Sequence, residues 1–234
     1  MFPSNRDTIK NRLLAALPSG ELDQFWSKLQ PVTLSQRQIL YAAGAPIEEV
    51  YFLEEGLGSV LNAMANGTTI EVGMIGMEGV IGVSALLGAE ISAQTVLVQI
   101  PGAGYRMSAS RCKAIFDQSA AFRAPVLRFA EAMLNMTAQT AACNRLHSVE
   151  QRCARWLLMS SDRIGSDSMP MTHEFLASML GVRRAGVTTT AGDLQRSGLI
   201  RYHHGQLTIT DRDGLESAAC ECYAIDHDQL DSLL

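Results

Sequence analysis

Two adjacent arginines and a run of threonines follow a glycine in MTHEFLASMLGVRRAGVTTTAGDLQRSGLI, which runs from Met171 to Ile200. A guanidinium group such as that of Arg183 or Arg184 can bond a guanine edge bidentately or pair with a phosphate, and a threonine methyl can contact the thymine methyl. The chain has a formal net charge of −5. Contact with a nucleic acid therefore requires a local basic face rather than bulk charge.

Short amphipathic helices are predicted to position these side chains. Thr172 stands where a helix N-cap would, and Gly181 ends the first helix. The second helix begins at once, so the two must cross steeply, as in a helix-turn-helix. The segments of LIRYHHGQLTITD that flank His204-Gly205 predict a β-hairpin, or wing. The candidate DNA-binding residues are Thr172, Arg183, Arg184, Ala185, Thr188, Thr189 and Arg201.

An ordinary helical hairpin with a solvated arginine pair is the alternative interpretation of this motif. The wing and the local charge favour DNA binding. Between Thr172 and Gly205 the basic residues are Arg183, Arg184, Arg196 and Arg201, against the acidic Glu174 and Asp193.

Short apolar segments broken by glycine extend from Pro31 to about Met107 and predict a β-barrel or roll. The expected strands are Gln38–Tyr41, Glu49–Leu53, Gly58–Ala63 and Thr69–Met74, with a hairpin tip at Asn66-Gly67. A short helix is expected around Thr8–Leu17. The carboxylates of Glu54, Glu55, Glu71 and Glu78 are interpreted as solvated strand ends or turn residues.

From about Ser108 the pattern is helical, with Pro125 expected near a helix start. Apolar, small and polar residues then recur at alternating spacings of three and four, as in a helix that pairs with another helix. These candidate dimer-interface residues are Leu127, Ala130, Leu134, Thr137, Ala141 and Asn144. A core-facing stripe of a monomer would give the same periodicity. A short connector is expected at Arg163–Pro170.

The composition is that of a globular protein, with 234 residues of which 47% are hydrophobic and 18% charged. No apolar run reaches the ~18 residues that span a bilayer, and the N-terminal segment lacks the features of a signal peptide. We therefore expect a cytoplasmic protein with no membrane partner. Because P-loop, Gly-x-Ser-x-Gly, His-Glu-x-x-His and dinucleotide motifs are missing, the sequence does not favour an enzyme.

The order of β-roll, long helix and winged helix resembles that of the Crp/Fnr superfamily of bacterial transcription regulators. The stretches that carry the resemblance are RQILYAAGAPIEEVYFLEEG, EGVIGVSALLG and HEFLASMLGVRRAGVTTTAGDLQRSGLI. The resemblance implies an α+β fold with a cyclic-nucleotide-binding-like β-roll (jelly roll) in a sensor domain at 1–119. It also implies a dimerisation helix at 120–146 and a winged helix-turn-helix DNA-binding domain at 147–234.

The partners implied by the resemblance are double-stranded DNA with a palindromic operator, a second copy of the chain, and RNA polymerase. The family's nucleotide-binding members carry a Gly-Glu pair and an Arg-Ser or Arg-Thr pair. This chain has Gly82-Val83 and the segment SAQT, which ends in Gln94-Thr95. Because a buried phosphate without a cation is costly, we predict that the usual cyclic AMP mode is lost.

The effector-pocket candidates are therefore Gly82, Val83, Gln94 and Thr95. This region could bind another small molecule, or its apolar residues could simply belong to the core; these are Val80, Ile81, Val83, Leu86 and Leu87. The leading hypothesis is a sequence-specific DNA-binding transcription regulator, either effector-responsive or constitutive. The alternatives are a redox-gated or small-molecule-gated regulator of the same fold, and a protein-interaction module with a diverted winged helix.

The five cysteines are odd in number and scattered, which argues against a disulfide framework. Cys112 and Cys143 are interpreted as buried packing residues, with a redox role as the alternative. Cys220 and Cys222 are interpreted as structural or incidental, because two thiolates alone do not close a zinc site. No cysteine precedes Cys112 and no histidine precedes His147, so we expect no metal and no cofactor.

The recognition helix departs from the family pattern. Well-known members use an Arg-Glu pair and a further arginine, whereas here Arg184 is followed by Ala185 and then Thr189. The glutamate would accept from a cytosine amino group and the second arginine would bond a guanine. The operator is therefore expected to differ from the best-known consensus sites.

Overall fold

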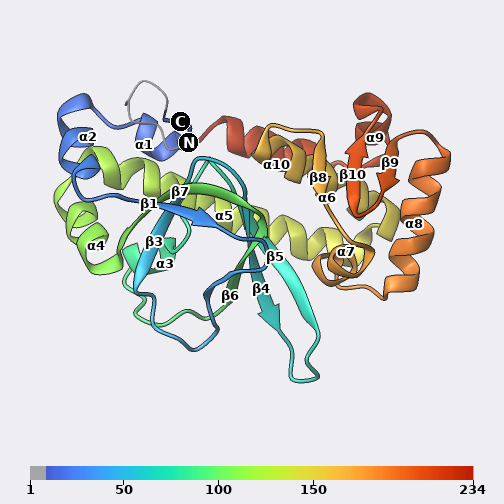
Figure 1. The fold of residues 1–234 in the computed structure, drawn as a ribbon, viewed down its shortest axis with the longest axis horizontal. Coiled ribbons are helices and arrows are strands. Elements are labelled where there is room, and N and C mark those ends of the chain that lie inside the picture. The colour runs from blue at the N-terminus through green and yellow to red at the C-terminus, as the bar shows by residue number, and fades with distance from the viewer. Residues whose placement is uncertain (1–8, 234) are drawn as a thin grey trace. The chain divides into compact units, whose positions relative to one another are not determined.

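The computed structural model describes residues 9–233, which fold into two compact units (Figure 1). Unit 1 contains the described chain up to Val60, Met74–Leu134 and the chain from Leu230. Unit 2 contains Leu61–Gly73 and Asn135–Gln229. The α+β fold class predicted from the sequence is confirmed.

The N-terminal helical segment differs from the prediction. The expected helix around Thr8–Leu17 is wrong in extent, because α1 spans only Arg12–Ala15 and α2 follows at Ser19–Trp26. Pro18 separates them with extended backbone at the N-cap of α2. Its nitrogen has no hydrogen to donate and its ψ of 143° is far from the helical value, so the first helix does not continue through this position. Thr8 itself lies outside the described residues.

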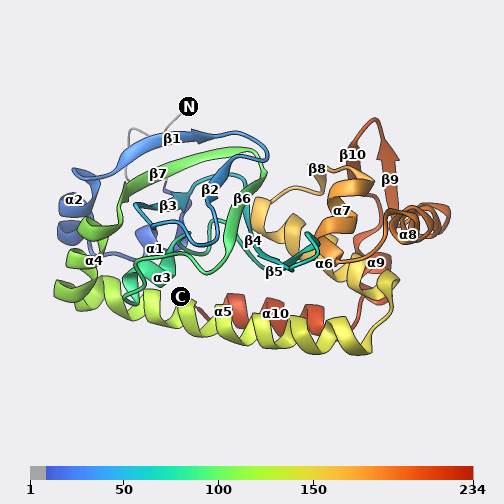
Figure 2. The same ribbon diagram turned by 90° about the horizontal axis from the view of Figure 1, so that it is seen from below.

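The β-roll contains one sheet in the order β1-β7-β3 and one in the order β2-β6-β4-β5 (Figure 2). The strands are β1 (Gln30–Leu34), β2 (Ile39–Tyr41), β3 (Glu49–Leu53), β4 (Leu57–Ala63), β5 (Thr69–Ile75), β6 (Thr95–Ile100) and β7 (Gly102–Ser108). The four strands predicted from the sequence are confirmed as β2 to β5. Gly67 has a φ of 80° at the predicted hairpin tip, which the missing side chain permits.

Both sheets contribute to one apolar core with the helices of unit 1. At its centre, the ring of Phe25 on α2 lies 5.6 Å from that of Phe52 on β3 and 4.8 Å from that of Phe122. These aromatic side chains are at most 2% exposed. Their packing stabilises the roll through apolar burial and edge-to-face ring contacts.

The interpretation of Glu54, Glu71 and Glu78 as solvated residues is wrong, because each is at most 6% exposed. Glu54 accepts from the backbone nitrogens of Lys10 and Asn11, at 2.8 and 3.2 Å. Glu78 accepts from the backbone nitrogen of Gly76. Buried carboxylates are tolerated when such donors satisfy them. Burial also raises the pKa of Glu54, against the lowering effect of its backbone donors.

The short helix α3 (Val83–Leu86) lies between β5 and β6, and the roll is followed by α4 (Ala109–Gln118) and α5 (Ala120–Leu146). Pro125 was expected near a helix start, but it lies inside α5. The helix begins earlier because the hydroxyl of Ser119 accepts from the backbone nitrogen of Phe122 at 3.0 Å, as an N-cap does. The cost of Pro125 is the missing hydrogen bond to the carbonyl of Ala121.

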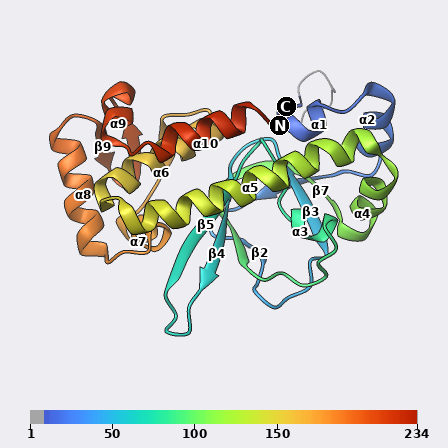
Figure 3. The ribbon, with the colours of Figure 1, turned by 180° about the vertical axis from the view of Figure 1, so that it is seen from behind.

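Unit 2 is built from the second half of α5 and the elements that follow it (Figure 3). These are α6 (Val149–Ile164), β8 (Ser168–Pro170), α7 (His173–Leu180), α8 (Arg184–Arg196), β9 (Ile200–His203), β10 (Gln206–Ile209), α9 (Arg212–Ala218) and α10 (Cys222–Asp231). Ser148 and Gln151 form a capping box that starts α6. The expected connector at Arg163–Pro170 also contains β8, which pairs with β10 and which the sequence pattern did not indicate.

Candidate nucleic-acid interface

The turn between α7 and α8 is organised by a cap at each end of α7. The hydroxyl of Thr172 accepts from the backbone nitrogen of Phe175 at 3.1 Å, which confirms the predicted N-cap. Gly181 has a φ of 63° and ends the helix. The following nitrogen, that of Val182, bonds back to the carbonyl of Ala177 at 3.0 Å, as in a Schellman motif. This turn allows α8 to begin at Arg184.

One face of α8 is buried and the other is exposed. The buried side chains are Val187, Thr190, Ala191 and Leu194. The exposed residues at its start are Arg183, Arg184, Ala185, Thr188 and Thr189. The structure therefore brings together five of the sequence-predicted site residues on one exposed surface. Thr172, also exposed, begins α7, and Arg201 belongs to the wing.

The threonine hydroxyls on this face bond within the helix. Thr188 Oγ1 donates to the carbonyl of Arg184 at 3.0 Å, and Thr189 Oγ1 donates to that of Ala185 at 3.2 Å. Each hydroxyl hydrogen is thus used locally, while the methyl group remains for a partner. This arrangement suits apolar contact with a thymine methyl.

The charges at the start of α8 are not neutralised by neighbours. Among residues 9–233, no ion pair involves Arg183, Arg184 or Arg201. By contrast, Arg196 at the other end of α8 pairs with Asp193. The start of α8 therefore combines unpaired guanidinium groups with the free N–H groups of a helix terminus, which also favour anions.

The predicted wing is confirmed as β9 and β10, with Gln206 opposite His203. Both turn residues have positive φ, 47° at His204 and 77° at Gly205, as a tight two-residue hairpin requires. Arg201 is exposed on β9. The wing thus supplies a second cationic position within the same unit as α8.

His173 connects α7, α8 and the wing. Its Nδ1 is 3.2 Å from the hydroxyl of Thr188, and its ring lies 4.6 Å from that of Tyr202 on β9. The hydroxyl of Tyr202 donates to the carbonyl of Met171. Burial and the nearby charge of Arg184 lower the pKa of His173. A neutral imidazole is therefore part of the support of α8.

The tip of the β4-β5 hairpin, residues Leu61–Gly73, packs within unit 2, a contact that the sequence analysis missed. The buried carboxylate of Glu71 accepts from Trp156 Nε1 at 2.7 Å, and the hydroxyls of Thr69 and Ser178 are 2.8 Å apart. These partners are 85 and 109 residues apart. Local periodicity carries no information about pairs at such separations.

The effector-pocket candidates lie in unit 1. Gly82 is buried with a φ of 94°, and a Cβ there would lie 2.6 Å from the hydroxyl of Tyr41. Val83 begins α3, and Thr95 begins β6 and accepts from the backbone nitrogen of Ala43. Val83, Gln94 and Thr95 are half-buried. Of the apolar residues interpreted as core, Leu87 is 53% exposed, so that interpretation is wrong for Leu87.

The candidate dimer stripe on α5 is largely uncovered in the single chain. Leu127 is 46% exposed and Leu134 is 70% exposed. Thr137 and Ala141 are exposed, while Ala130 and Asn144 are half-buried. A different set of α5 residues faces the core, including Val126, Phe129 and Met136.

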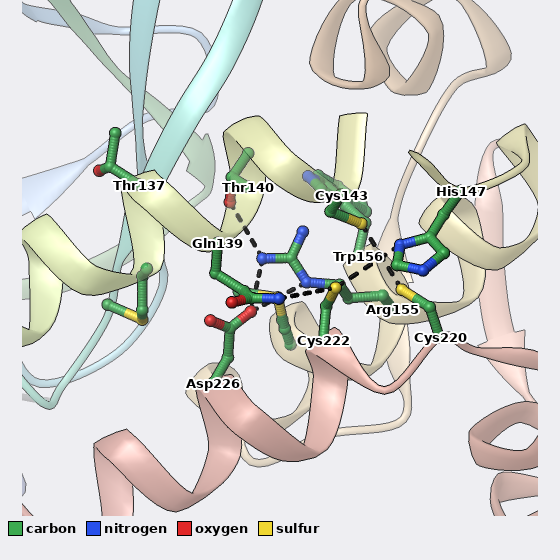
Figure 4. Close-up of polar contacts among 12 residues, drawn as sticks. Thr137, Gln139, Thr140, Cys143, His147, Arg155, Trp156, Cys220, Cys222 and Asp226 are labelled. Atoms are coloured by element: carbon green, nitrogen blue, oxygen red, sulfur yellow. Dashed lines mark hydrogen bonds and ion pairs between the residues drawn. The ribbon is translucent and has the colours of Figure 1, made fainter. Parts of the chain in front are cut away.

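The cysteines are all buried, and four of the five lie in unit 2. Burial raises the pKa of Cys112 and of Cys153 to about 12, which keeps these thiols protonated. Cys143, Cys220 and Cys222 instead form a small cluster (Figure 4). His147 joins them, and together these four side chains are a donor set that could hold a metal ion. Cys220 and Cys222 were interpreted from the sequence as an incomplete pair, because Cys143 and His147 lie more than 70 residues away and join them only in the folded chain.

Comparison with protein families agrees with this architecture. Residues 31–119 match the cyclic nucleotide-binding domain, and residues 151–218 match the Crp-like helix-turn-helix domain. The chain belongs to the Crp/Fnr superfamily. A search of curated protein sequences found no significant match. Within the described chain, no helix is both long and apolar enough to cross a membrane.

Solved structures of Crp/Fnr regulators share the fold. FixK2 from Bradyrhizobium japonicum has a TM-score of 0.70 and 14% identity, covering 82% of this chain and 98% of its own. A CRP-family transcriptional regulator from Thermus thermophilus has a TM-score of 0.69 and 21% identity, covering 80% and 96%. The c-di-GMP responsive global regulator CLP from Xanthomonas campestris has a TM-score of 0.65 and 17% identity, covering 82% and 99%. At these identities the likeness shows the shared fold.

Proposed function

We propose that this Crp/Fnr member is a transcription regulator that binds a palindromic DNA operator as a homodimer and has no catalytic step. The observation that carries the proposal is the exposed start of α8, where Arg183 and Arg184 have no ion-pair partner among the described residues. In a helix-turn-helix, the N-terminal residues of the second helix contact base edges in the major groove. We assign base contact to Arg184, Ala185, Thr188 and Thr189, and phosphate contact to Arg183, Thr172 and Arg201.

The second copy would pack along the α5 stripe. Leu127 is 46% exposed and Leu134 is 70% exposed. Exposing such apolar surface to water is unfavourable, and a second helix would cover it. Small residues such as Ala130 and Ala141 would permit close approach of the two helices. A two-fold dimer would then read half-sites about one helical turn apart.

The proposed domain roles follow the same division of the chain. Residues 1–119 would sense a signal, 120–146 would form the dimer helix and 147–234 would bind DNA and present a surface to RNA polymerase. Among Gly82, Val83, Gln94 and Thr95 there is no carboxylate for a ribose and no cation for a phosphate. We therefore propose that cyclic AMP is not the effector. CLP, of the same fold, responds to c-di-GMP, so a different small molecule or no effector at all is consistent with the fold.

The decisive experiment is selection of binding sites from random duplex DNA by the purified full chain, with no effector added. We expect a two-fold symmetric motif, and we expect the Arg183→Ala/Arg184→Ala double variant to enrich none. A folded, dimeric wild-type protein that enriches no sequence would contradict DNA recognition by the unliganded chain and would favour a protein-interaction role. Calorimetric titration with cyclic AMP tests the effector proposal, which tight stoichiometric binding would overturn.

A further inference from the structure

Three thiols and one imidazole converge in unit 2 from two distant parts of the chain (Figure 4). Cys143 lies in the last turn of α5. The backbone nitrogen of His147 bonds to its carbonyl at 3.1 Å, so the two side chains, four residues apart, share one helical face. Cys220 lies between α9 and α10, and Cys222 is the first residue of α10.

The spacing of the donor atoms fits one metal ion. All four donor atoms lie within 4.8 Å of one another. Cys143 Sγ is 3.5 Å from Cys220 Sγ, and Cys222 Sγ is 3.6 Å from His147 Nδ1. A zinc tetrahedron with Zn–S bonds of about 2.3 Å places its donors about 3.5 to 3.8 Å apart. Small side-chain movements would therefore complete the tetrahedron, whereas an iron–sulfur cluster inserts several atoms between its ligands and needs a wider cage.

The groups around the donors are those that support metal ligands. The far nitrogen of His147, Nε2, is 3.3 Å from Glu221 Oε1, which leaves Nδ1 directed at Cys222. Ligating histidines commonly donate their second N–H to a carboxylate in this way, which fixes the tautomer and the orientation of the ring. Gln139 Nε2 lies 3.0 Å from Cys222 Sγ and donates to it. Such a donor stabilises a thiolate.

The site is closed and lies beside a buried guanidinium group. Cys143, Cys220 and Cys222 are at most 5% exposed, and the His147 side chain is 15% exposed. Four nitrogen and sulfur donors leave no position for water, as in structural rather than catalytic zinc sites. Three thiolates and one Zn²⁺ carry a net charge of −1; the guanidinium of Arg155, which also pairs with Asp226, lies nearby and favours the thiolate of Cys143.

We propose that Cys143, His147, Cys220 and Cys222 bind one structural zinc ion. The ligands bracket residues 148–219, so the ion would join the two ends of the segment that contains the helix-turn-helix and the wing. The ion would hold the two ends of this segment together in the folded unit. The proposal does not depend on DNA binding and its test uses no DNA.

The test is the metal content of the full chain, produced with zinc in the medium and purified under reducing conditions. Elemental analysis should find about one zinc per chain. Cys220→Ser should lower this at least about tenfold. Cys153→Ser is the matched control, because Cys153 is a buried thiol of the same unit outside the cluster, and it should retain the zinc.

A second measurement covers the case in which Cys220→Ser does not fold. Glu221→Gln changes an exposed side chain, 71% accessible, and should weaken zinc affinity by about 10- to 100-fold through His147. Cobalt added to the chelated protein should give the intense visible absorption of a tetrahedral thiolate site, with one equivalent per chain.

Several results would overturn the proposal. The first is that the wild-type protein contains no zinc and takes up no cobalt. The second is that Cys220→Ser and Cys153→Ser lower the zinc content equally. Bound iron with inorganic sulfide would assign the residues to a different centre. A Cys143–Cys220 disulfide that persists under reductant would remove two of the four ligands and would equally sink the idea.

Discussion

Arg184→Ala should abolish recognition of one base pair in each half of the operator while leaving the fold intact. The side chain is exposed and, among the described residues, has no ion pair, so its removal breaks no intramolecular contact of that kind. Alanine also has the highest helix propensity, which preserves α8. A bidentate contact to guanine contributes about 1 to 3 kcal/mol of discrimination. A symmetric dimer has two such contacts, so affinity should fall by about 2 to 6 kcal/mol, or roughly 30-fold to 20,000-fold.

Fluorescence anisotropy with the selected operator, at several salt concentrations, measures this loss. Arg183→Ala, which removes a proposed phosphate contact, should weaken binding to all sequences and reduce the salt slope by about 1.8 for the dimer. Arg196→Ala is the matched control, because Arg196 lies at the other end of α8 and already pairs with Asp193. The reasoning would be refuted if folded Arg184→Ala bound the operator within twofold of the wild-type affinity. It would also be refuted if Arg196→Ala lost as much operator affinity as Arg184→Ala.

The pKa of His173 gives a second measure of the Arg184→Ala substitution. The charge of Arg184 contributes to the lowered pKa of His173, whose Nδ1 contacts Thr188. Its removal should raise that pKa toward the ordinary value of 6.5, whereas Arg184→Lys should leave it low. Titration of the His173 ring signal by NMR distinguishes a lost charge from a displaced helix, since displacement would alter the pKa in both variants.

Three further predictions concern the surroundings of the interface. Leu134→Glu places a charge in the proposed dimer seam and should give a monomer by sedimentation, while Glu131→Gln, outside the stripe, should not; an unchanged dimer would locate the seam elsewhere. Trp156→Phe removes one hydrogen-bond donor to buried Glu71 and should lower the free energy of unfolding by about 1.5 to 3 kcal/mol in a denaturant titration; no loss would mean that this contact does not stabilise the fold in solution. His173 is protonated near pH 6.5 in the unfolded state and only at lower pH in the folded state, so the melting temperature should decrease as the pH is lowered through about 6.5. His173→Asn should flatten this dependence on pH. Parallel profiles for the variant and the wild type would exclude His173 as the cause.

Elements determined by local patterns were predicted well. Glu49–Leu53 was expected as a strand and is β3, because its length and its bounding turns are properties of adjacent residues. Gly67, Gly181 and His204-Gly205 have the expected positive φ, since tolerance of that conformation depends mainly on the residue itself, whereas Asn66 does not have positive φ. Pro125 shows the limit of such rules. Its preference for a first turn was overridden by the cap at Ser119, which started the helix earlier.

The class of fold and the basic helix follow from local sequence, because helix periodicity, turn residues and caps act within about a dozen residues. Which distant polar groups meet depends on folding in three dimensions. Glu71 was interpreted as solvated until Trp156 was found 2.7 Å away, 85 residues along the chain. Likewise Cys220 and Cys222 are an incomplete pair in the sequence, and His147 and Cys143 join them only after folding. Pairs at such separations are selected by the packing of whole elements, so spacing in the sequence cannot reveal them.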